Sequence, residues 1–499
     1  MSEGDFQSLD PDPDPDEFRE LGYRVVDLMA EHYAQIQDID NFPDTTPPEV
    51  TDLFDDPLPR EGQDPEDVID EWEERVYPYA AHPGSPRWFG YVQGSGTPMG
   101  ALADALAASV NMNAGGWIAG PSATEIERQC IRWLAEMIDY HTDCGGILTS
   151  GGTMANHTAI YAALQSTTDF EARESGLRAQ AHHGRFTLYE SAHEGHSSVG
   201  RVAEMIGVGS DAIRMVPCDD EYRMDPDALD TMLSEDIENG HVPFCVVANV
   251  GSINVSAIAD ICDKHDVWMH ADGACGAVGA ILPEKEHLYE GLDQADSVTL
   301  DPHKWFSIPY SCGCVLFRDP KVQARSFSME AEYLDVTEKE DYQGTNFGFL
   351  GPEMSRPFRA LKLWMNLKHR GIEGYRQLLR KSCRCAEYLH DRVVEADDFE
   401  TVQTPNLFIY SFRYLPADLG HENEHSVNQA AIDEYVDWLN QRITDDLRLT
   451  GEAFVTTTEV QDQTVIRLSI CSHRTTVSDI DTAFEALREY GERIDAENR

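Results

Sequence analysis

Short apolar runs and longer amphipathic stretches alternate through the middle of the chain. The apolar runs predict strands at 146–149, 186–189, 213–216, 242–250, 267–271, 297–300 and 313–317. Apolar residues with helical spacing separate most of these runs, and the last two runs are placed to form a hairpin. Strands joined in order by helices form parallel sheets that helices cover. The pattern therefore predicts a doubly wound α/β domain with a mainly parallel, seven-stranded sheet.

The two ends of the chain show other patterns. Helical spacing predicts helices at 18–36 and 65–76, and the Pro- and Asp-rich segment 40–64 between them predicts an extended arm that packs on a partner subunit. A long helical region at 358–389 leads to a small α+β unit, with strands at 407–412, 454–458 and 463–470 and helices at 427–447 and 477–490. We expect an N-terminal helical arm segment at 1–95, a large domain at 96–385 and a small C-terminal domain at 386–499.

Local signals mark two helix starts and one loop. Ser122, followed three residues later by Glu125, has the spacing of a capping box and predicts Ser122 as an N-cap. Asp225 predicts a second N-cap. The stretch 320–350 is polar and irregular, which inside a compact enzyme is typical of a functional loop or of a disordered segment.

Charge restricts the partners and the environment that can be expected. Asp and Glu number 90 against 38 Lys and Arg, a formal charge of −52. This charge repels nucleic acid and anionic membranes, so neither is expected as a partner. Acidic residues spread along the chain indicate adaptation to high salt, which screens their repulsion. We expect a halophilic, cytoplasmic protein, because the first residues lack a signal-peptide pattern and no apolar run is long enough to cross a bilayer.

Cysteine and histidine spacing does not favour a metal site. The eleven cysteines include no CxxC pair, so buried, reduced thiols are expected rather than zinc ligands or disulfides. His193 and His196 in HEGH lack the i, i+4 spacing of HExxH.

Lys304 is the first candidate for chemistry. The chain has only eight lysines, and this one lies between the apolar run 298–300 and the aromatic pair Trp305 and Phe306. Burial lowers the pKa of an ammonium group, and the neutral amine is the form that makes Schiff bases. Taken alone, Lys304 fits equally well as a packed lysine whose ammonium group reaches water.

Three further signals lie at the ends of predicted strands, where ligands bind in open α/β sheets. The turn TSGGT at 149–153 suits a phosphate, because glycines allow close approach and the following helix offers free N–H groups; an ordinary tight turn fits it too. Asp272 could keep a heterocyclic nitrogen protonated or cap its own turn. His193 or His196 could stack on a flat cofactor or cap the next helix. Together with a buried lysine, these signals are what a pyridoxal 5′-phosphate (PLP) site needs.

Longer motifs extend this pattern over most of the chain. They are SPRWFGYV, PSATEIE, TSGGTMAN, GHSSVGRV, WMHADGACGA, DSVTLDPHKW, FRALKLW and CSHRTT. With these motifs the chain resembles, from about residue 18 to its end, the group II PLP-dependent decarboxylases, which include the aromatic-L-amino-acid, glutamate and histidine decarboxylases. The resemblance implies the aspartate aminotransferase type I fold and a homodimer with its active sites at the subunit interface.

The resemblance also implies a role for each matching residue. Lys304 would bind the cofactor, Asp272 would pair with the pyridine nitrogen, and the ring would lie between His196 and Ala274. The residues near the phosphate or elsewhere on the cofactor would be Gly152, Thr153, Ser252, Asp301 and His303.

The reaction implied by the resemblance is decarboxylation to a primary amine. Asp272 would keep the ring nitrogen protonated, so that electrons of the Cα–CO2 bond flow into the ring. Tyr333, on a mobile loop, would then protonate Cα with His196 as relay. Loss of that tyrosine or histidine goes with aldehyde chemistry in the family, and both are present here. Tyr91 and Trp117 would belong to the substrate pocket.

The substrate is less well defined by the sequence than the chemistry. The PSATEIE region most resembles the aromatic branch, so we expect an aromatic L-amino acid of the tyrosine, tryptophan, phenylalanine or DOPA type. An acidic substrate such as glutamate, aspartate or cysteine sulfinate would need an arginine, with Arg356 and Arg359 as candidates. An aldehyde synthase, an aminotransferase or an inactive PLP-binding homologue are further alternatives. Positions that depart from the family pattern are Asn113, Gly115 and Cys275.

Overall fold

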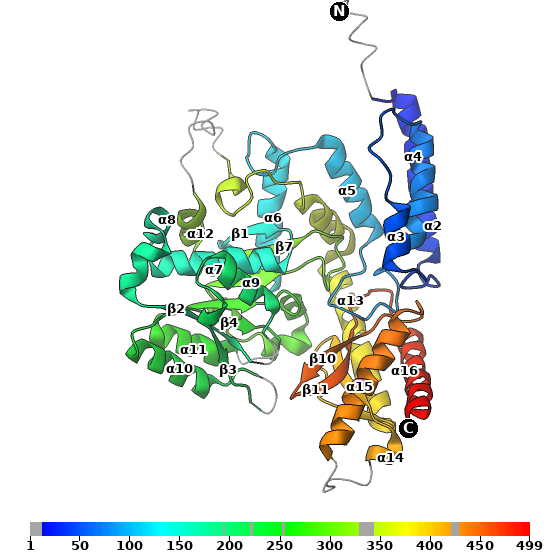
Figure 1. Ribbon diagram of the computed structural model, residues 1–499. Coiled ribbons are helices and arrows are strands. Elements are labelled where there is room, and N and C mark those ends of the chain that lie inside the picture. Colours follow the sequence, from blue (N-terminus) through cyan, green and yellow to red (C-terminus); the bar gives the residue numbers. More distant parts are fainter. Residues whose placement is uncertain (1–11, 193–194, 220–222, 252–254, 329–343, 421–428) are drawn as a thin grey trace, which may run out of the picture.

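The computed structural model describes residues 12–192, 195–219, 223–251, 255–328, 344–420 and 429–499. Figure 1 shows a large domain around a twisted sheet, a smaller C-terminal domain below it, and N-terminal helices along one side. In the described part of the chain no helix is both long and apolar enough to cross a membrane. All eleven cysteines are free thiols, and all except Cys144, Cys218 and Cys275 are buried.

The large domain contains the predicted seven-stranded sheet. Its strands are β1 (Gly145–Thr149), β2 (Phe186–Ser191), β3 (Ile213–Val216), β4 (Val242–Asn249), β5 (Trp268–Asp272), β6 (Ser297–Leu300) and β7 (Gly313–Phe317). The order across the sheet is β1-β7-β6-β5-β4-β2-β3. Only β7 runs against its neighbours, pairing antiparallel with β1 and with β6. The first strands of the domain are almost wholly buried because helices cover the sheet.

The helices of the large domain follow the predicted alternation. They are α5 (Pro98–Val110), α6 (Pro121–Met137), α7 (Gly152–Thr167), α8 (Ala172–Ser175), α9 (Ser197–Met205), α10 (Pro226–Glu238), α11 (Val255–His265) and α12 (Pro320–Phe327). Asp225 caps α10 as predicted, because its carboxylate accepts hydrogen bonds from the N–H groups of Asp227 and Ala228.

Two local predictions in this domain are wrong. Ser122 is not an N-cap, because α6 already begins at Pro121 after Gly120, and the Ser122 hydroxyl lies 3.6 Å from the sulfur of Met112. Proline is favoured at the first helical position, so the helix starts two residues earlier than the capping-box spacing indicates. The stretch 320–350 is also not irregular throughout, since its first residues form α12.

The N-terminal segment is helical and is hydrogen-bonded to the C-terminal domain through Asn41. Helix α2 (Pro15–Gln35) begins with an Asp14 cap and has no buried residue. The predicted extended arm contains a short helix, α3 (Pro47–Leu53), because Thr46 and Glu49 form a capping box there. Helix α4 (Pro65–Glu71) follows and continues as a π-helical turn (Trp72–Val76). Asn41 fastens the segment to the C-terminal domain through its side-chain amide, which donates to the carbonyls of Gly451 and Glu452 at 3.0 and 3.2 Å.

The C-terminal domain is the predicted small α+β unit. Its antiparallel sheet has the order β10-β11-β9-β8, where β8 (Phe399–Thr401) was not predicted. The other elements are β9 (Ile409–Tyr414), α14 (Ala417–Gly420), α15 (Gln429–Arg448), β10 (Thr456–Val460), β11 (Gln463–Ser469) and α16 (Val477–Asn498). The long helix α13 (Ala360–Glu395) joins the two domains and is broken at Gly371. The boundaries at 95/96 and 385/386 stay predictions.

Candidate active site

Lys304 lies in the turn that follows β6, at the edge of the sheet where the parallel strands end. Its ammonium group is 3.1 Å from a carboxylate oxygen of Asp301 and 3.6 Å from the sulfur of Cys275. The backbone packs against Gly94, whose hypothetical Cβ would lie 2.2 Å from the Lys304 carbonyl oxygen. The SPRWFGYV region therefore adjoins the lysine turn.

The charge state of Lys304 differs from the prediction. Burial disfavours the ammonium form, but Cys275, Asp301 and Asp272 outweigh burial and raise the pKa of Lys304 above its ordinary value. The expectation that burial alone leaves a neutral amine is therefore wrong. The two carboxylates hold the lysine protonated in these surroundings.

Asp272 ends β5 on the same edge of the sheet. One carboxylate oxygen accepts the N–H of Ala274 at 3.1 Å, so Asp272 does cap its own turn. The other accepts the side-chain amide of Asn156 at 2.7 Å. Both interactions stabilise the charged carboxylate, which is the form that can pair with a protonated ring nitrogen.

The glycine turn and Asp301 lie directly against each other. The N–H of Gly152 donates to Asp301 at 2.9 Å, and a Cβ at this glycine would lie 2.7 Å from the same carboxylate. Helix α7 has no side-chain cap, and Thr153 in its first turn is exposed. Asp301 is 1% exposed, and its second oxygen has no hydrogen-bond partner among the described residues.

His196 and His303 complete the edge. His196 is exposed and caps α9, because its Nδ1 accepts the N–H of Ser198 at 3.2 Å. His303 is buried 3.8 Å from Asp301, and burial lowers the pKa of its imidazole. A helix N-terminus that no side chain caps and a lysine beside two carboxylates fit PLP, with phosphate at the turn and the amine at the aldehyde.

Other predicted residues are not brought to this cluster. Tyr91 is exposed with its ring 5.6 Å from that of Phe454. The N–H of Trp117 donates to the side-chain oxygen of Asn346 at 3.2 Å. His193, Ser252 and Tyr333 lie outside the described residues.

Three residues around Asp272 and Cys275 were missed by sequence reasoning. Asn156 binds Asp272 from α7, and Glu190 is a buried acid whose pKa is raised to about 8 by burial, with Asp272 adding to the effect. Burial lowers the pKa of Arg467 on β11, while Cys275 and Cys471 oppose that shift, which places the guanidinium near the site. Arg467 had a detectable signal, since a lone arginine interrupts the apolar run TVIRLSI.

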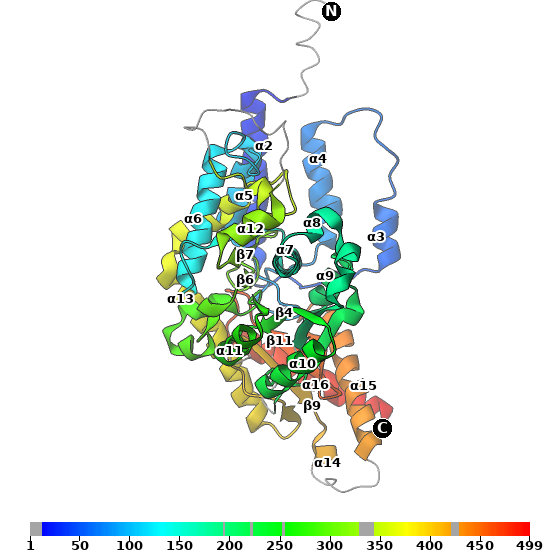
Figure 2. The same cartoon turned by 90° about the vertical axis from the view of Figure 1, so that its left-hand side faces the viewer.

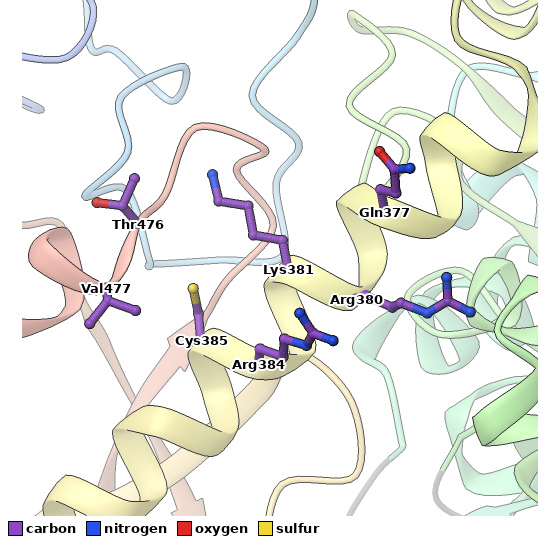
Figure 3. A pocket seen from close by; sticks show the side chains of 7 residues that line it. All are labelled: Gln377, Arg380, Lys381, Arg384, Cys385, Thr476 and Val477. Carbon is purple, nitrogen blue, oxygen red and sulfur yellow. The ribbon is translucent and has the colours of Figure 1, made fainter.

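A separate cavity of about 470 Å³ lies between α13 and the start of α16. Figure 3 shows Lys381 and Cys385 pointing from α13 toward Thr476 and Val477, with Arg380 on the opposite side of the helix. None of the predicted site residues lines this cavity, so it is distinct from the lysine cluster.

Comparisons with known proteins identify the family of the chain. Residues 47–415 match the family described as pyridoxal-dependent decarboxylase conserved domain. The chain is 32% identical over 486 residues to the aromatic-L-amino-acid decarboxylase of Bacillus atrophaeus, covering 96% of both chains, and 26% identical to tryptophan decarboxylase 2 of Oryza sativa subsp. japonica, again over 96% of each.

Solved structures share the fold. The crystal structure of Oryza sativa TDC with PLP and tryptamine has 25% identity and a TM-score of 0.87, covering 96% of this chain and 99% of that one. Mouse CSAD, at 22% identity, covers the same shares with a TM-score of 0.88. The chain therefore belongs to the pyridoxal-dependent decarboxylase family and is a PLP-dependent amino-acid decarboxylase.

Proposed function

We propose that this enzyme decarboxylates an aromatic L-amino acid to the primary amine and CO2, with Lys304 as the residue that binds PLP. The observation that carries the site assignment is the Lys304 ammonium group beside Asp301, on the sheet edge where Asp272 also ends its strand. The substrate class is supported by the names of the relatives, which are aromatic-L-amino-acid, tryptophan and tyrosine decarboxylases.

Bound PLP supplies an aldehyde for the substrate amine and a ring that accepts electrons from the breaking Cα–CO2 bond. Asp272, charged and doubly hydrogen-bonded, would hold the proton on the ring nitrogen. His196 and Ala274 would cover the two ring faces. The phosphate would be held by Gly152, Thr153 and His303, with Asp301 beside them.

Two residues outside the described part of the chain keep the roles that the resemblance implies. Tyr333 would deliver a proton to Cα, and Ser252 would lie near the cofactor. Tyr91 and Trp117 would contribute to the substrate pocket.

An acidic substrate would need an arginine to bind its side chain, and both candidate arginines have carboxylate partners within the protein. Arg356 is buried with Glu127 at 2.7 Å, and Arg359 donates to both carboxylate oxygens of Glu353. Breaking a buried pair is costly, so neither guanidinium is available for a substrate side chain. Among the described residues, Arg467 is a further cation near Cys275, and it would suit any substrate carboxylate. Arg467→Met should therefore raise KM for whichever substrate is used, which is measured by steady-state kinetics.

Borohydride labelling tests the site. Reduction of the yellow holoenzyme should fix the cofactor on the peptide that contains Lys304, as read by mass spectrometry. Lys362→Met is the matched control, because Lys362 is also buried but its ammonium group binds the Tyr310 carbonyl at 2.7 Å and Asp104 at 3.2 Å. A colourless, unlabelled protein, or a label on Lys362, contradicts the assignment.

Product analysis tests the substrate and the reaction type. We expect CO2 release from aromatic L-amino acids in molar salt, with the amine as product. Release from glutamate, aspartate or cysteine sulfinate alone would support the acidic alternative, and an aldehyde product would support the synthase alternative.

The enzyme is also proposed to be a homodimer. Figures 1 and 2 show α2, α3 and α4 standing outside both domains. Helix α2 exposes Phe18 and Tyr23, and α5 exposes Leu106 and Val110. Large exposed apolar patches on soluble proteins are typical of interfaces, so a second copy of the chain would cover these helices.

A further inference from the structure

Behind Asp272 lies a chain of buried hydrogen bonds whose direction is fixed by chemistry. The indole N–H of Trp268 can only donate, and it donates to the hydroxyl of Ser297 at 2.9 Å. The Ser297 hydroxyl is 2.8 Å from Nδ1 of His270. A hydroxyl has a second lone pair, so the direction is set from the other end of these bonds: the Asn156 nitrogen must donate to the Asp272 carboxylate, the Asn156 oxygen must then accept from Nε2–H of His270, and Nδ1 accepts the Ser297 proton.

His270 in turn fixes the amide of Asn156. Nε2 of His270 is 3.1 Å from the side-chain oxygen of Asn156, so the imidazole donates and the amide oxygen accepts. The amide nitrogen must then face the other way. It lies 2.7 Å from Asp272 and 3.1 Å from the hydroxyl of Ser198, as a donor to both requires.

The second branch ends at His196. Nδ1 of His196 accepts the backbone N–H of Ser198 and lies 2.7 Å from the Ser198 hydroxyl. Because a backbone N–H can only donate, Nδ1 carries no proton, and the ring proton of the neutral imidazole is on Nε2. The hydrogen bonds from Asn156 to Asp272 and from Asn156 through Ser198 to His196 therefore require the same orientation of the Asn156 amide.

We propose that Asn156 is the positioning residue of this site, whose single amide group, oriented by Ser297 and His270, fixes both Asp272 and the imidazole of His196. This inference rests on the roles given above to those two residues. Asn156 has no hydrogen bond to Lys304, and it acts directly on Asp272 and by way of Ser198 on His196.

The arrangement suits a site that needs a charged carboxylate. On the branch from Trp268 through Ser297, His270 and Asn156, each donor points toward Asp272, so these bond dipoles stabilise its negative charge. Burial lowers the pKa of His270 to about 4, although Asp272 opposes the shift. His270 is therefore neutral near pH 7 and adds no competing charge.

Two variants of Asn156 separate its contacts. Asn156→Asp keeps an oxygen for His270 but replaces the donor to Asp272 and Ser198, while Asn156→Leu removes all contacts. Both should weaken PLP retention and lower kcat about tenfold or more, with Asn156→Asp also shifting the pH dependence of the cofactor's absorption. Wild-type retention, spectrum and kcat in Asn156→Asp would overturn the proposal.

A second pair of variants keeps the test independent of catalysis. Ser297→Ala removes the partner of His270 Nδ1, and Thr299→Val is its matched control, because the Thr299 hydroxyl lies 3.4 Å from the other ring nitrogen on the same strand. In 15N spectra of histidine-labelled holoenzyme, Ser297→Ala should shift the Nδ1 resonance of His270 and Thr299→Val should leave it in place. The same Nδ1 resonance of His270 in both variants would overturn the proposed series of hydrogen bonds from Ser297 to Asp272. Full activity of Asp272→Ala and His196→Ala would instead reject the proposed function. That outcome would not change the conclusion drawn from the spectra of Ser297→Ala and Thr299→Val.

Discussion

Glu190 shows how one residue can couple the site to pH. It is 4% exposed at the end of β2, one of its oxygens has no hydrogen-bond partner in the part of the chain described, and it lies against Gly195, where a Cβ would come within 2.6 Å. The backbone N–H of His196 hydrogen-bonds to its carboxyl group. Glu190 thus supports the turn that carries His196.

The raised pKa of Glu190 predicts a pH-dependent loss of stability. Burial raises the pKa of the folded Glu190 carboxyl group to about 8, whereas the unfolded group has its ordinary pKa of about 4.5, so the folded state becomes less stable as pH rises through this window. Glu190→Gln should therefore gain stability over the wild type at pH 8.5, of the order of 4 kcal/mol, and little at pH 5. Urea unfolding at both pH values measures this.

The control for this prediction is Glu204→Gln on the neighbouring helix α9, where the side chain is exposed. It should leave the difference between the two pH values unchanged. A Glu190→Gln profile parallel to that of the wild type would contradict the assigned pKa.

For single residues, the sequence predicted Lys304 and Asp272 as site residues but not Asn156, which binds Asp272. Lys304 and Asp272 stand in distinctive local motifs, and the structure brings them to one edge. Asn156 is 116 residues from Asp272, and no local pattern can report a contact over that separation. The charge of Lys304 was also misjudged, because it depends on Asp301 and Asp272 together and not on burial alone.

At the scale of elements, α13 depends on one glycine. Gly371 has φ 64° and ψ 171° inside a 36-residue helix, a conformation that residues with a side chain rarely adopt. No atom lies within 4 Å of a hypothetical Cβ there, so substitution meets backbone strain and no steric clash.

Gly371→Ala should therefore destabilise the protein by about 1–3 kcal/mol. Gly374→Ala is the matched control three residues later, where the backbone is helical and the nearest atom is 3.3 Å away, at the Cβ of Arg370. It should be neutral or stabilising by up to about 1 kcal/mol, since alanine favours helix. Denaturation midpoints compare the two, and equal losses would contradict the role of the break.

Element boundaries were predictable where the signal is local. Asp225 caps α10 as expected because its carboxylate binds the first N–H groups of the helix itself. Ser122 failed because two local signals compete, and Pro121 starts the helix before the serine can cap it. Strand β8 was missed because it is only three residues long, and its pairing with β9 defines it.

At the scale of the molecule, the exposed helices predict an interface. Leu106 and Val110 on α5 are 54% and 57% exposed. Leu106→Glu with Val110→Glu should convert a dimer to monomers, because burying two carboxylates in an apolar contact is costly. Sedimentation velocity in molar salt measures the change. Val394→Glu, at a position 59% exposed on the C-terminal end of α13, is the control and should keep the wild-type mass. A monomeric wild type would contradict the proposal.

Net charge predicts the response to salt. At −52 the folded chain repels itself strongly, and salt screens that repulsion within a Debye length of about 10 Å at 0.1 M and about 3 Å at 1 M. We expect Tm and activity to rise between these concentrations of KCl. Sucrose at equal osmolality is the control, because it carries no charge. A Tm that does not respond to KCl would contradict the inferred halophilic adaptation.

The antiparallel direction of β7 limits which amino acid substitutions the enzyme can accept at Gly313. Because β7 runs against β1 and β6, its first residue, Gly313, lies where those strands end, opposite Thr149. A Cβ there would lie 2.6 Å from the Cα of Gly151 and 2.7 Å from the orphaned oxygen of Asp301. Any larger residue would wedge the glycine turn away from the lysine turn. Evolution or a saturation library can vary the surface around this position widely, but position 313 itself admits one amino acid.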